Sequence, residues 1–304
     1  MKAIETITIC ICTLRRLEGL ERLLRGLAQQ VTQGEFTIDV VVIENDREER
    51  ARSLVEGLRE ELGFSIRYAL ETEPGIAVAR NRALQLAQGD YVAIIDDDEF
   101  PSPEWLLRMK RGIATFGVDG TLGPIFPFFD APPPVWLAKS RFCELPVYPT
   151  GTLLRWDQTR TGNVLLRRTF LVAHGLTFDA RFRTGGSDQD FFKRAMAVGG
   201  RFVAIEEGAV YETVPRERWT TSYWVRRALV NGFNANKYFA GSGLGIRVRR
   251  GTKSLMAVVV YALATPFAAC AGRHRLMQLV EKGAYHLSSL CGLIGVEPWK
   301  KRDF

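Results

Sequence analysis

The sequence predicts an α/β fold, a mostly parallel sheet sandwiched by helices. Short apolar runs alternate along the chain with longer segments whose leucines recur at helical spacing. Such alternation is typical of parallel strands that are joined by helical crossovers. The predicted strands are residues 7–12, 38–43, 65–70, 91–95 and 164–167. The predicted helices are residues 15–30, 48–62, 77–87 and 188–198.

Composition and charge limit the kinds of protein that this chain can be. With 304 residues, 46% of them hydrophobic, the chain can bury a large core. Its net charge of +7 favours anionic partners, whether nucleotides, nucleic acid or an anionic lipid surface. Five scattered cysteines without a CxxC pattern argue against a disulfide framework or a zinc site. The first residues show no apolar run of the signal-peptide type, so we expect a cytoplasmic catalytic part.

The strand at 91–95 ends in four consecutive acids, Asp96, Asp97, Asp98 and Glu99. Clustered carboxylates repel one another, and a bound divalent cation is one way to offset that repulsion. A ligand set made only of oxygen atoms favours Mg²⁺ or Mn²⁺. The alternative interpretation is that these acids only begin an exposed polar loop.

Acidic residues also follow the strand at 38–43, where the chain continues as Glu44-Asn45-Asp46. Parallel sheets of this class bind ligands beyond the carboxyl ends of their strands. We therefore expect these residues to converge with the acids at 96–99 on one site.

Two helix starts carry further candidate residues. A proline and a glycine come just before the helix at 77–87, which holds Arg80 in its first turns. A helix amino end with arginines is an anion site, although an ordinary surface helix can begin in the same way. Asp188 begins the helix at 188–198, directly after a glycine-rich turn. It either caps that helix or provides an acid–base group in a cleft.

Five segments in a fixed order carry a family resemblance over about residues 5 to 200. They are Thr13-Leu14-Arg15-Arg16, "VVVIEND", "PGIAVARNRAL", "GDYVAIIDDDEFPSPEWL", and "TGNVLLRR" followed by "GGSDQDFFKRA". Together they resemble family 2 of the inverting glycosyltransferases, enzymes of the GT-A (Rossmann-like) fold. The acidic segment and the later run "RWTTSYWVRR" look most like bacterial exopolysaccharide enzymes of the succinoglycan-biosynthesis type.

The resemblance implies a nucleotide-sugar donor, with a UDP-sugar expected, and a role for each matching position. Nucleotide contacts are implied for Thr13, Glu44, Asp46, Arg80, Asp96 and Asp97. Asp96 and Asp98 match the family's DxD acids, of which Asp98 would bind a Mn²⁺ or Mg²⁺ ion. Asp188 takes the place of the general base, which removes the proton of the acceptor hydroxyl.

Three positions depart from the family pattern. Glu44 stands where the family more often has Asp, and Ser187 stands where an acid usually precedes the base. Many relatives have a histidine beyond this helix, whereas here Glu212 is available. Glu212 either completes the metal site or is an ordinary strand residue.

We expect two domains. Residues 1–240 would form the glycosyltransferase domain, with a nucleotide-sugar half at 1–123 and an acceptor half at 124–240. Proline-rich residues 124–162 are predicted to be an irregular loop or lid. The basic and aromatic stretch at 216–227 either packs its aromatics on the core or binds a diphosphate and a sugar acceptor.

Residues 241–304 are predicted to be a basic and apolar helical segment that associates with a membrane. The run at 254–271 has eighteen residues without a charge and lies between basic clusters. It is barely long enough to span a bilayer, and its cationic flanks argue against a simple crossing. We expect it, with the shorter apolar run at 283–296, to dip into the membrane or lie on it. The alternative is a buried helical hairpin of a soluble domain.

These expectations combine into one functional hypothesis. The chain would transfer a sugar to a lipid-linked saccharide at the cytoplasmic face of the bacterial inner membrane. One alternative is a soluble transferase for another acceptor. Another is a nucleotidyltransferase, which would usually carry a glycine-rich loop after its first strand, and this sequence lacks one. The basic and aromatic residues form no recognised nucleic-acid-binding module, so no nucleic-acid partner is expected.

Overall fold

The computed structural model of the protein describes residues 4–182, 186–236 and 243–296. Its contacts divide the chain into two units. Unit 1 consists of Met1–Phe128 and Glu144–Thr213, and unit 2 consists of Phe129–Cys143 and Val214–Phe304. This division lies earlier in the chain than the expected boundary at residue 240, because the segments on either side of that position pack together.

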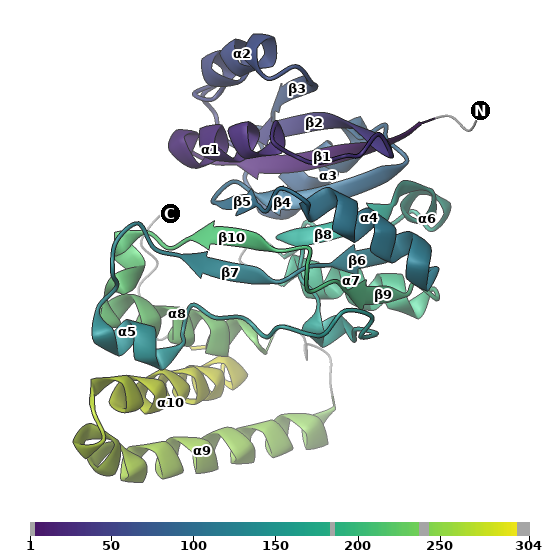
Figure 1. The fold of residues 1–304 in the computed structure, drawn as a ribbon. Coiled ribbons are helices and arrows are strands. Elements are labelled where there is room, and N and C mark those ends of the chain that lie inside the picture. Colours follow the sequence, from purple (N-terminus) through teal and green to yellow (C-terminus); the bar gives the residue numbers. More distant parts are fainter. Residues whose placement is uncertain (1–3, 183–185, 237–242, 297–304) are drawn as a thin grey trace. The chain divides into compact units, whose positions relative to one another are not determined.

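Unit 1 is built on a seven-stranded sheet (Figure 1) with the strand order β3-β2-β1-β4-β8-β6-β9. Neighbouring strands from β3 to β4 are parallel, β8 is antiparallel to both of its neighbours, and β9 is parallel to β6. The strands are β1 (Glu5–Thr13), β2 (Phe36–Glu44), β3 (Ser65–Leu70), β4 (Tyr91–Asp96), β6 (Gly120–Leu122), β8 (Asn163–Arg167) and β9 (Phe202–Ala204). The prediction of a mostly parallel sheet is confirmed.

Helices cover both faces of this sheet because its central strands are apolar on both faces. In β1, Ile9 and Ile11 join the hydrophobic core on one face and Cys10 joins the core on the other. The first core is closed by α1 (Leu17–Leu27), α2 (Arg52–Glu61) and α4 (Trp105–Phe116). The second core is closed by α3 (Ile76–Leu86), α6 (Arg168–Ala173) and α7 (Ser187–Ala197).

A second, three-stranded sheet in unit 1 has the order β5-β10-β7. Its strands are β5 (Glu99–Pro101), β7 (Ile125–Phe128) and β10 (Val210–Thr213). The prediction that 124–162 is wholly irregular is wrong, since it contains β7, α5 (Val135–Ser140) and the short 3₁₀ helix η1 (Trp156–Gln158). Pro127 is tolerated in β7 because this strand lies at the edge of the sheet, where a missing N–H donor breaks few bonds.

Unit 2 is helical. Besides α5 it contains η2 (Arg216–Trp219), α8 (Thr221–Asn234), α9 (Leu244–Cys270) and α10 (Arg273–Leu293), and α10 packs against α5, α8 and α9. Trp136, Leu137, Trp224 and Met277 form its buried core, against which Trp219 packs. The tryptophans of the basic and aromatic stretch therefore contribute to the core of this unit.

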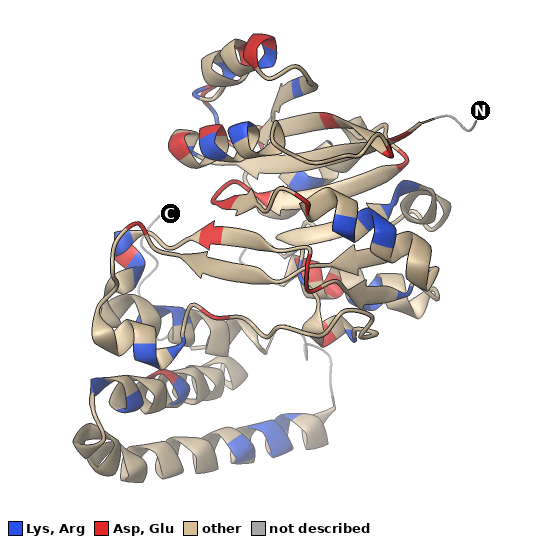
Figure 2. Cartoon of the chain, in the orientation of Figure 1, with Lys and Arg blue, Asp and Glu red and all other residues tan. Residues whose placement is uncertain are grey.

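Helix α9 is long, apolar and poorly covered. Of the residues that the structure describes, only this helix is long and apolar enough to cross a membrane, with a mean hydropathy of 1.6 over its most apolar window. Only 11% of that window is buried, which differs from the core helix of a soluble domain. Figure 2 shows its basic residues gathered in the first turns, and these are Arg247, Arg249, Arg250 and Lys253.

Candidate functional site

The candidate site begins where β1, β2 and β4 end together. In the parallel register Thr13 lies beside Glu44, and Cys12 lies beside Asp96. The carboxyl ends of these strands therefore bring the predicted residues of all three segments to one edge of the sheet. The sequence predicted this convergence from the parallel arrangement of the strands, and the observed strand order produces it.

Asp97 ties the end of β4 to the exit of β1. Its carboxylate is buried and accepts a hydrogen bond from Thr13 Oγ1 at 2.8 Å and one from Arg16 Nη1 at 2.8 Å. The backbone N–H of Leu14 adds a longer bond of 3.4 Å to the same carboxylate. With its oxygens used in this way, Asp97 holds the acidic turn in place, and the contacts favour a supporting role over a direct ligand role.

Asp98 shares the guanidinium of Arg16 with Asp97. Arg16 Nη1 lies 2.8 Å from Asp98 Oδ2, and Arg16 is half exposed whereas Asp98 is largely buried. The pKa of Asp98 is raised to about 6, mainly by burial; Arg16 opposes the rise, and the charges of Glu212 and Asp96 contribute to it. Arg16 is therefore shared between two carboxylates.

Glu99 adds a further acid to the same neighbourhood. It is buried, and burial together with the charge of Asp96 raises its pKa well above the usual range. Glu99 also lies directly opposite Glu212 across the antiparallel pair of β5 and β10. The backbone of Gly162 packs closely against these acids, because a Cβ there would stand 2.6 Å from Glu99 Oε1 and 3.4 Å from Asp96 Oδ2.

These acids fit a hard divalent cation by the chemistry of their donors, which are all carboxylate oxygens. Besides burial, the charges of Asp96 and Glu212 raise the pKa values of both Asp98 and Glu99, and this repulsion is the observation that favours a cation there. In the described part of the chain no three ligating side chains are already arranged around one point.

Arg80 provides the buried positive charge of the site. It projects from α3, and its Nη2 lies 2.9 Å from Asp96 Oδ1. Burial lowers the pKa of Arg80, but the charges of Asp96 and Asp188 oppose this, so the pKa is raised overall. Among the described residues, no group accepts a hydrogen bond from its buried Nε. The guanidinium therefore keeps donor capacity beyond the ion pair with Asp96.

Asp188 lies in the first turn of α7, and the segment before this helix is hydrogen-bonded to α3. Asn81 Oδ1 accepts the N–H of Phe178 at 2.7 Å, and Asn81 Nδ2 donates to the carbonyl of Phe178 at 2.8 Å. The ring of Phe178 in turn stacks on Phe191 of α7 at 4.6 Å. This linkage explains how Asp188 comes close enough to influence Arg80.

The turn before α7 also depends on glycine. Gly186 has a φ of 94°, a left-handed conformation that side chains disfavour. Asp188 Oδ1 accepts the N–H of Gln189 at 3.0 Å, so one of its oxygens makes a local bond at the helix start. The N-cap of α7 is Gly186, and the role of Asp188 as an acid–base group stays a prediction.

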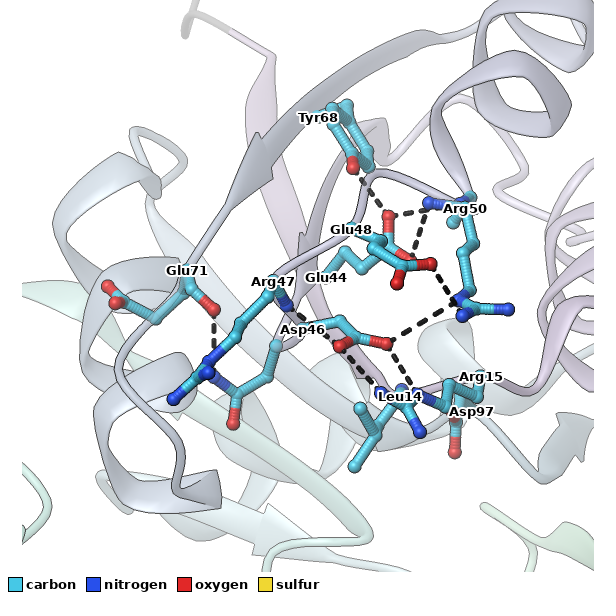
Figure 3. A network of polar contacts seen from close by, with 12 residues as sticks. Leu14, Arg15, Glu44, Asp46, Arg47, Glu48, Arg50, Tyr68, Glu71 and Asp97 are labelled. Atoms are coloured by element: carbon cyan, nitrogen blue, oxygen red, sulfur yellow. Dashed lines mark hydrogen bonds and ion pairs between the residues drawn. The ribbon is translucent and has the colours of Figure 1, made fainter.

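The hydrogen-bond partners of Glu44 differ from those of the acids at the end of β4 (Figure 3). It is fully buried, and its carboxylate accepts the N–H groups of Arg50 and Ala51 at 3.0 Å each, as well as the hydroxyl of Tyr68 at 2.5 Å. Buried N–H groups before a helix need such acceptors. These contacts favour a structural role at the start of α2.

Asp46 forms a two-pronged ion pair with Arg15 (Figure 3). The distances are 2.6 Å from Arg15 Nε to Oδ2 and 3.0 Å from Nη2 to Oδ1. Hydrogen bonds from Arg15 and from the N–H of Arg47 hold the pKa of Asp46 at about 2. Asn45 joins the same strand end to the loop before α3, since it donates to the carbonyl of Glu73 and accepts the N–H of Gly75.

Sequence reasoning gave no role to Arg16 or Asn81, and it included Glu99 only as the last acid of the cluster at 96–99. Their roles depend on partners from other elements, and no local pattern carries that information.

Comparisons with known proteins agree with this architecture. Residues 8–177 match the model of the family described as "Glycosyl transferase family 2". The succinoglycan biosynthesis protein ExoM of Rhizobium meliloti (strain 1021) is 33% identical over 98% of this chain and 96% of its own length. ExoU of the same strain is 25% identical over 67% of this chain and 61% of its own length.

Among solved structures, Staphylococcus aureus TarS 1–349 in complex with UDP matches with a TM-score of 0.55 and 18% identity, covering 94% of this chain and 90% of TarS 1–349. Its complex with UDP-GlcNAc has the same TM-score, with 15% identity, and covers 96% of this chain and 92% of the other. These likenesses show a GT-A-like fold.

Proposed function

Because the chain belongs to glycosyl transferase family 2, we propose that it is an inverting glycosyltransferase of bacterial exopolysaccharide synthesis, which transfers a sugar from a UDP-sugar to a lipid-linked saccharide. The observation that carries this proposal is the ion pair of buried Arg80 with Asp96, with Asp188 in the same electrostatic neighbourhood. A cation and a proton acceptor are the two groups that displacement of an anionic leaving group by a hydroxyl requires.

The donor nucleotide would bind at the carboxyl ends of β1 and β4. The names of the TarS structures include UDP and UDP-GlcNAc, which supports a uridine nucleotide. In this arrangement Arg80 and Asp96 are the direct contacts. Thr13 and Asp97 position the acidic turn, while Glu44 and the Asp46–Arg15 pair support the loops around it.

A Mn²⁺ or Mg²⁺ ion would be held by Asp98 and Glu212. When bound, such an ion neutralises charge on the diphosphate as it leaves. The chain's own contribution is to gather Asp96, Asp98 and Glu212 at the junction of the two sheets, where they would otherwise repel one another.

Asp188 would be the general base. As the acceptor oxygen bonds to the anomeric carbon, its proton passes to the Asp188 carboxylate. The bond from that carbon to the phosphate oxygen breaks, and UDP leaves with the electron pair. A single displacement of this kind inverts the anomeric configuration and requires no covalent sugar on the protein.

A lipid-linked acceptor would place the enzyme on the cytoplasmic face of the bacterial inner membrane. The support comes from α9, whose apolar residues are exposed and whose first turns are basic. Basic residues attract the anionic surface, and the apolar face can enter the headgroup boundary.

The test is transfer by the purified full-length protein from a panel of UDP-sugars to a lipid-linked saccharide fraction, with Mn²⁺ or Mg²⁺. We expect UDP release and a new glycosidic bond whose anomeric configuration, read by NMR, is opposite to that of the donor. Release of pyrophosphate would instead indicate nucleotidyl transfer. Retention of configuration, or transfer only to water-soluble acceptors, would contradict the mechanism or the acceptor proposed.

A further inference from the structure

Arg160 is a cation of unit 1 that the proposed function has not used. It follows η1 and lies two residues before Gly162. It is more than half buried, and no described residue forms a hydrogen bond or an ion pair with it. Burial lowers its pKa, which reflects the cost of keeping an unpaired guanidinium out of water.

The surroundings of Arg160 place it at the edge of the candidate site. Its charge interacts with Tyr148, Asp188, Glu99 and Glu212, each of which opposes the lowering of its pKa. The packing agrees, since η1 lies against α7, which carries Asp188. Arg160 also lines a small cavity with Tyr148 and Gln158.

The chain just after Arg160 touches the acids of β4 and β5. A Cβ at Gly162 would approach Glu99 Oε1 and Asp96 Oδ2, so the backbone there passes directly beside both carboxylates. Arg160 therefore follows a 3₁₀ helix that packs on α7, which carries the candidate base, and precedes a glycine that lies beside the acids of the candidate cation site.

The other arginines of the site differ from Arg160 in one respect. Arg15, Arg16 and Arg80 each lie within 3.0 Å of a carboxylate oxygen. Arg160 is attracted by several acids but bonded to none, so its donors are available for another anion. A divalent cation held by Asp98 and Glu212 would neutralise Glu212, one of the acids that attract Arg160, and would leave Arg160 more attractive to an incoming anion.

We propose that Arg160 binds the β-phosphate of the nucleoside diphosphate and stabilises that group as it leaves, together with Arg80. The inference rests on the proposed function, because it requires a diphosphate at this site. A guanidinium offers several donors in one plane, which suits the oxygens of a phosphate. The α-phosphate and the nucleoside are expected to make no contact with Arg160.

The test is calorimetric binding of UDP, UMP and uridine to the full-length protein in the presence of Mn²⁺. For Arg160→Gln we expect UDP affinity to fall about tenfold to a hundredfold, the range of a lost hydrogen bond between charged groups. Affinity for UMP and uridine should stay within about twofold of the wild type. The matched control is Arg155→Gln, an exposed arginine near the same 3₁₀ helix that is paired with Asp157.

Arg160→Lys keeps the charge without the planar donors, and we expect it to restore part of the UDP affinity. If Arg160→Gln does not fold, Arg160→Lys tests the proposal in its place, because it should still bind UDP less tightly than the wild type. Equal UDP affinity in the wild type and a folded Arg160 variant would overturn the proposal. So would an equal loss for UMP, or a raised KM for the acceptor with unchanged UDP binding. A wild-type protein that binds no uridine nucleotide would contradict the proposed function itself.

Discussion

Glu99 and Glu212 lie directly opposite each other in the antiparallel pair of β5 and β10. Residues at opposite positions project to the same face of a sheet, where like charges destabilise the pairing. Asp96 and Asp98 increase the negative potential around Glu99. A bound cation would relieve this repulsion, and this relationship leads to the first prediction.

Replacement of Glu212 by Gln should remove the response of the protein to divalent cations. With UDP present, Mn²⁺ should raise the free energy of unfolding of the wild type by about 2.7 kcal/mol at a hundredfold excess over its Kd. Glu212→Gln should lose most of this increase because one of the oxygen ligands loses its charge. Thermal unfolding with Mn²⁺ and with EDTA provides the measurement.

The matched control for this change is Glu206→Gln, an exposed acid in the turn before β10. It should respond to Mn²⁺ like the wild type. A wild-type protein whose unfolding is the same in Mn²⁺ and in EDTA would exclude Glu212 as a metal ligand.

Asp188→Asn should separate chemistry from binding. An amide cannot accept the acceptor's proton, so kcat should fall about 10² to 10⁴-fold, the usual contribution of a general base. UDP affinity should change by less than about threefold, since the proposed role of Asp188 is toward the acceptor hydroxyl. Asp190→Asn is the control, because Asp190 is already paired with Arg194 at 2.8 Å. Equal losses of activity in the two variants would indicate a helix effect in place of base catalysis.

A change at Glu44 distinguishes a structural role of this residue from a direct contact with the nucleotide. Glu44→Ala leaves the buried N–H of Ala51, the N–H of Arg50 and the Tyr68 hydroxyl without their acceptor, so the free energy of unfolding should fall by about 2 to 4 kcal/mol. Tyr68→Phe removes one of these bonds and should cost about 1 kcal/mol. Urea unfolding measures both.

The fraction of Glu44→Ala that remains folded should bind UDP as the wild type does. A large loss of UDP affinity at unchanged stability would instead support the nucleotide contact that the sequence resemblance implied.

The sheet and the meeting point of its strand ends could be predicted from the sequence because both follow from local patterns. Apolar runs such as 38–43 and 65–70 have strong strand character, and the ends of parallel strands meet by topology. The positions of Thr13 and Asp96 at one edge needed no further information.

The partners of the individual acids could not be predicted in the same way. In the sequence Asp97 and Asp98 are equivalent neighbours. In the structure Asp97 is buried and accepts a hydrogen bond from Thr13, whereas Asp98 is paired with Arg16 and is slightly more exposed. The role of Glu44 depends on the N–H groups of α2 and on Tyr68 from β3, which a pattern of acids does not reveal. Strand β7 was not predicted because it contains Pro127. A proline fits an edge strand, and the sequence does not show that β7 lies at an edge.

Helix α9 leads to the last prediction, which concerns the membrane. Leu263 and Phe267 lie one turn apart on this helix and are 69% and 79% exposed, so neither supports the core of unit 2. Replacing both with Glu removes apolar area from the exposed face and adds charge that an anionic lipid surface repels. With vesicles of phosphatidylcholine and about 30% phosphatidylglycerol, a flotation assay should show binding at least about a hundredfold weaker than for the wild type. Leu153→Glu, a change at an equally apolar and 58% exposed side chain of unit 1, should leave binding unchanged. Unaltered flotation of the double variant would mean that α9 does not contact the lipid.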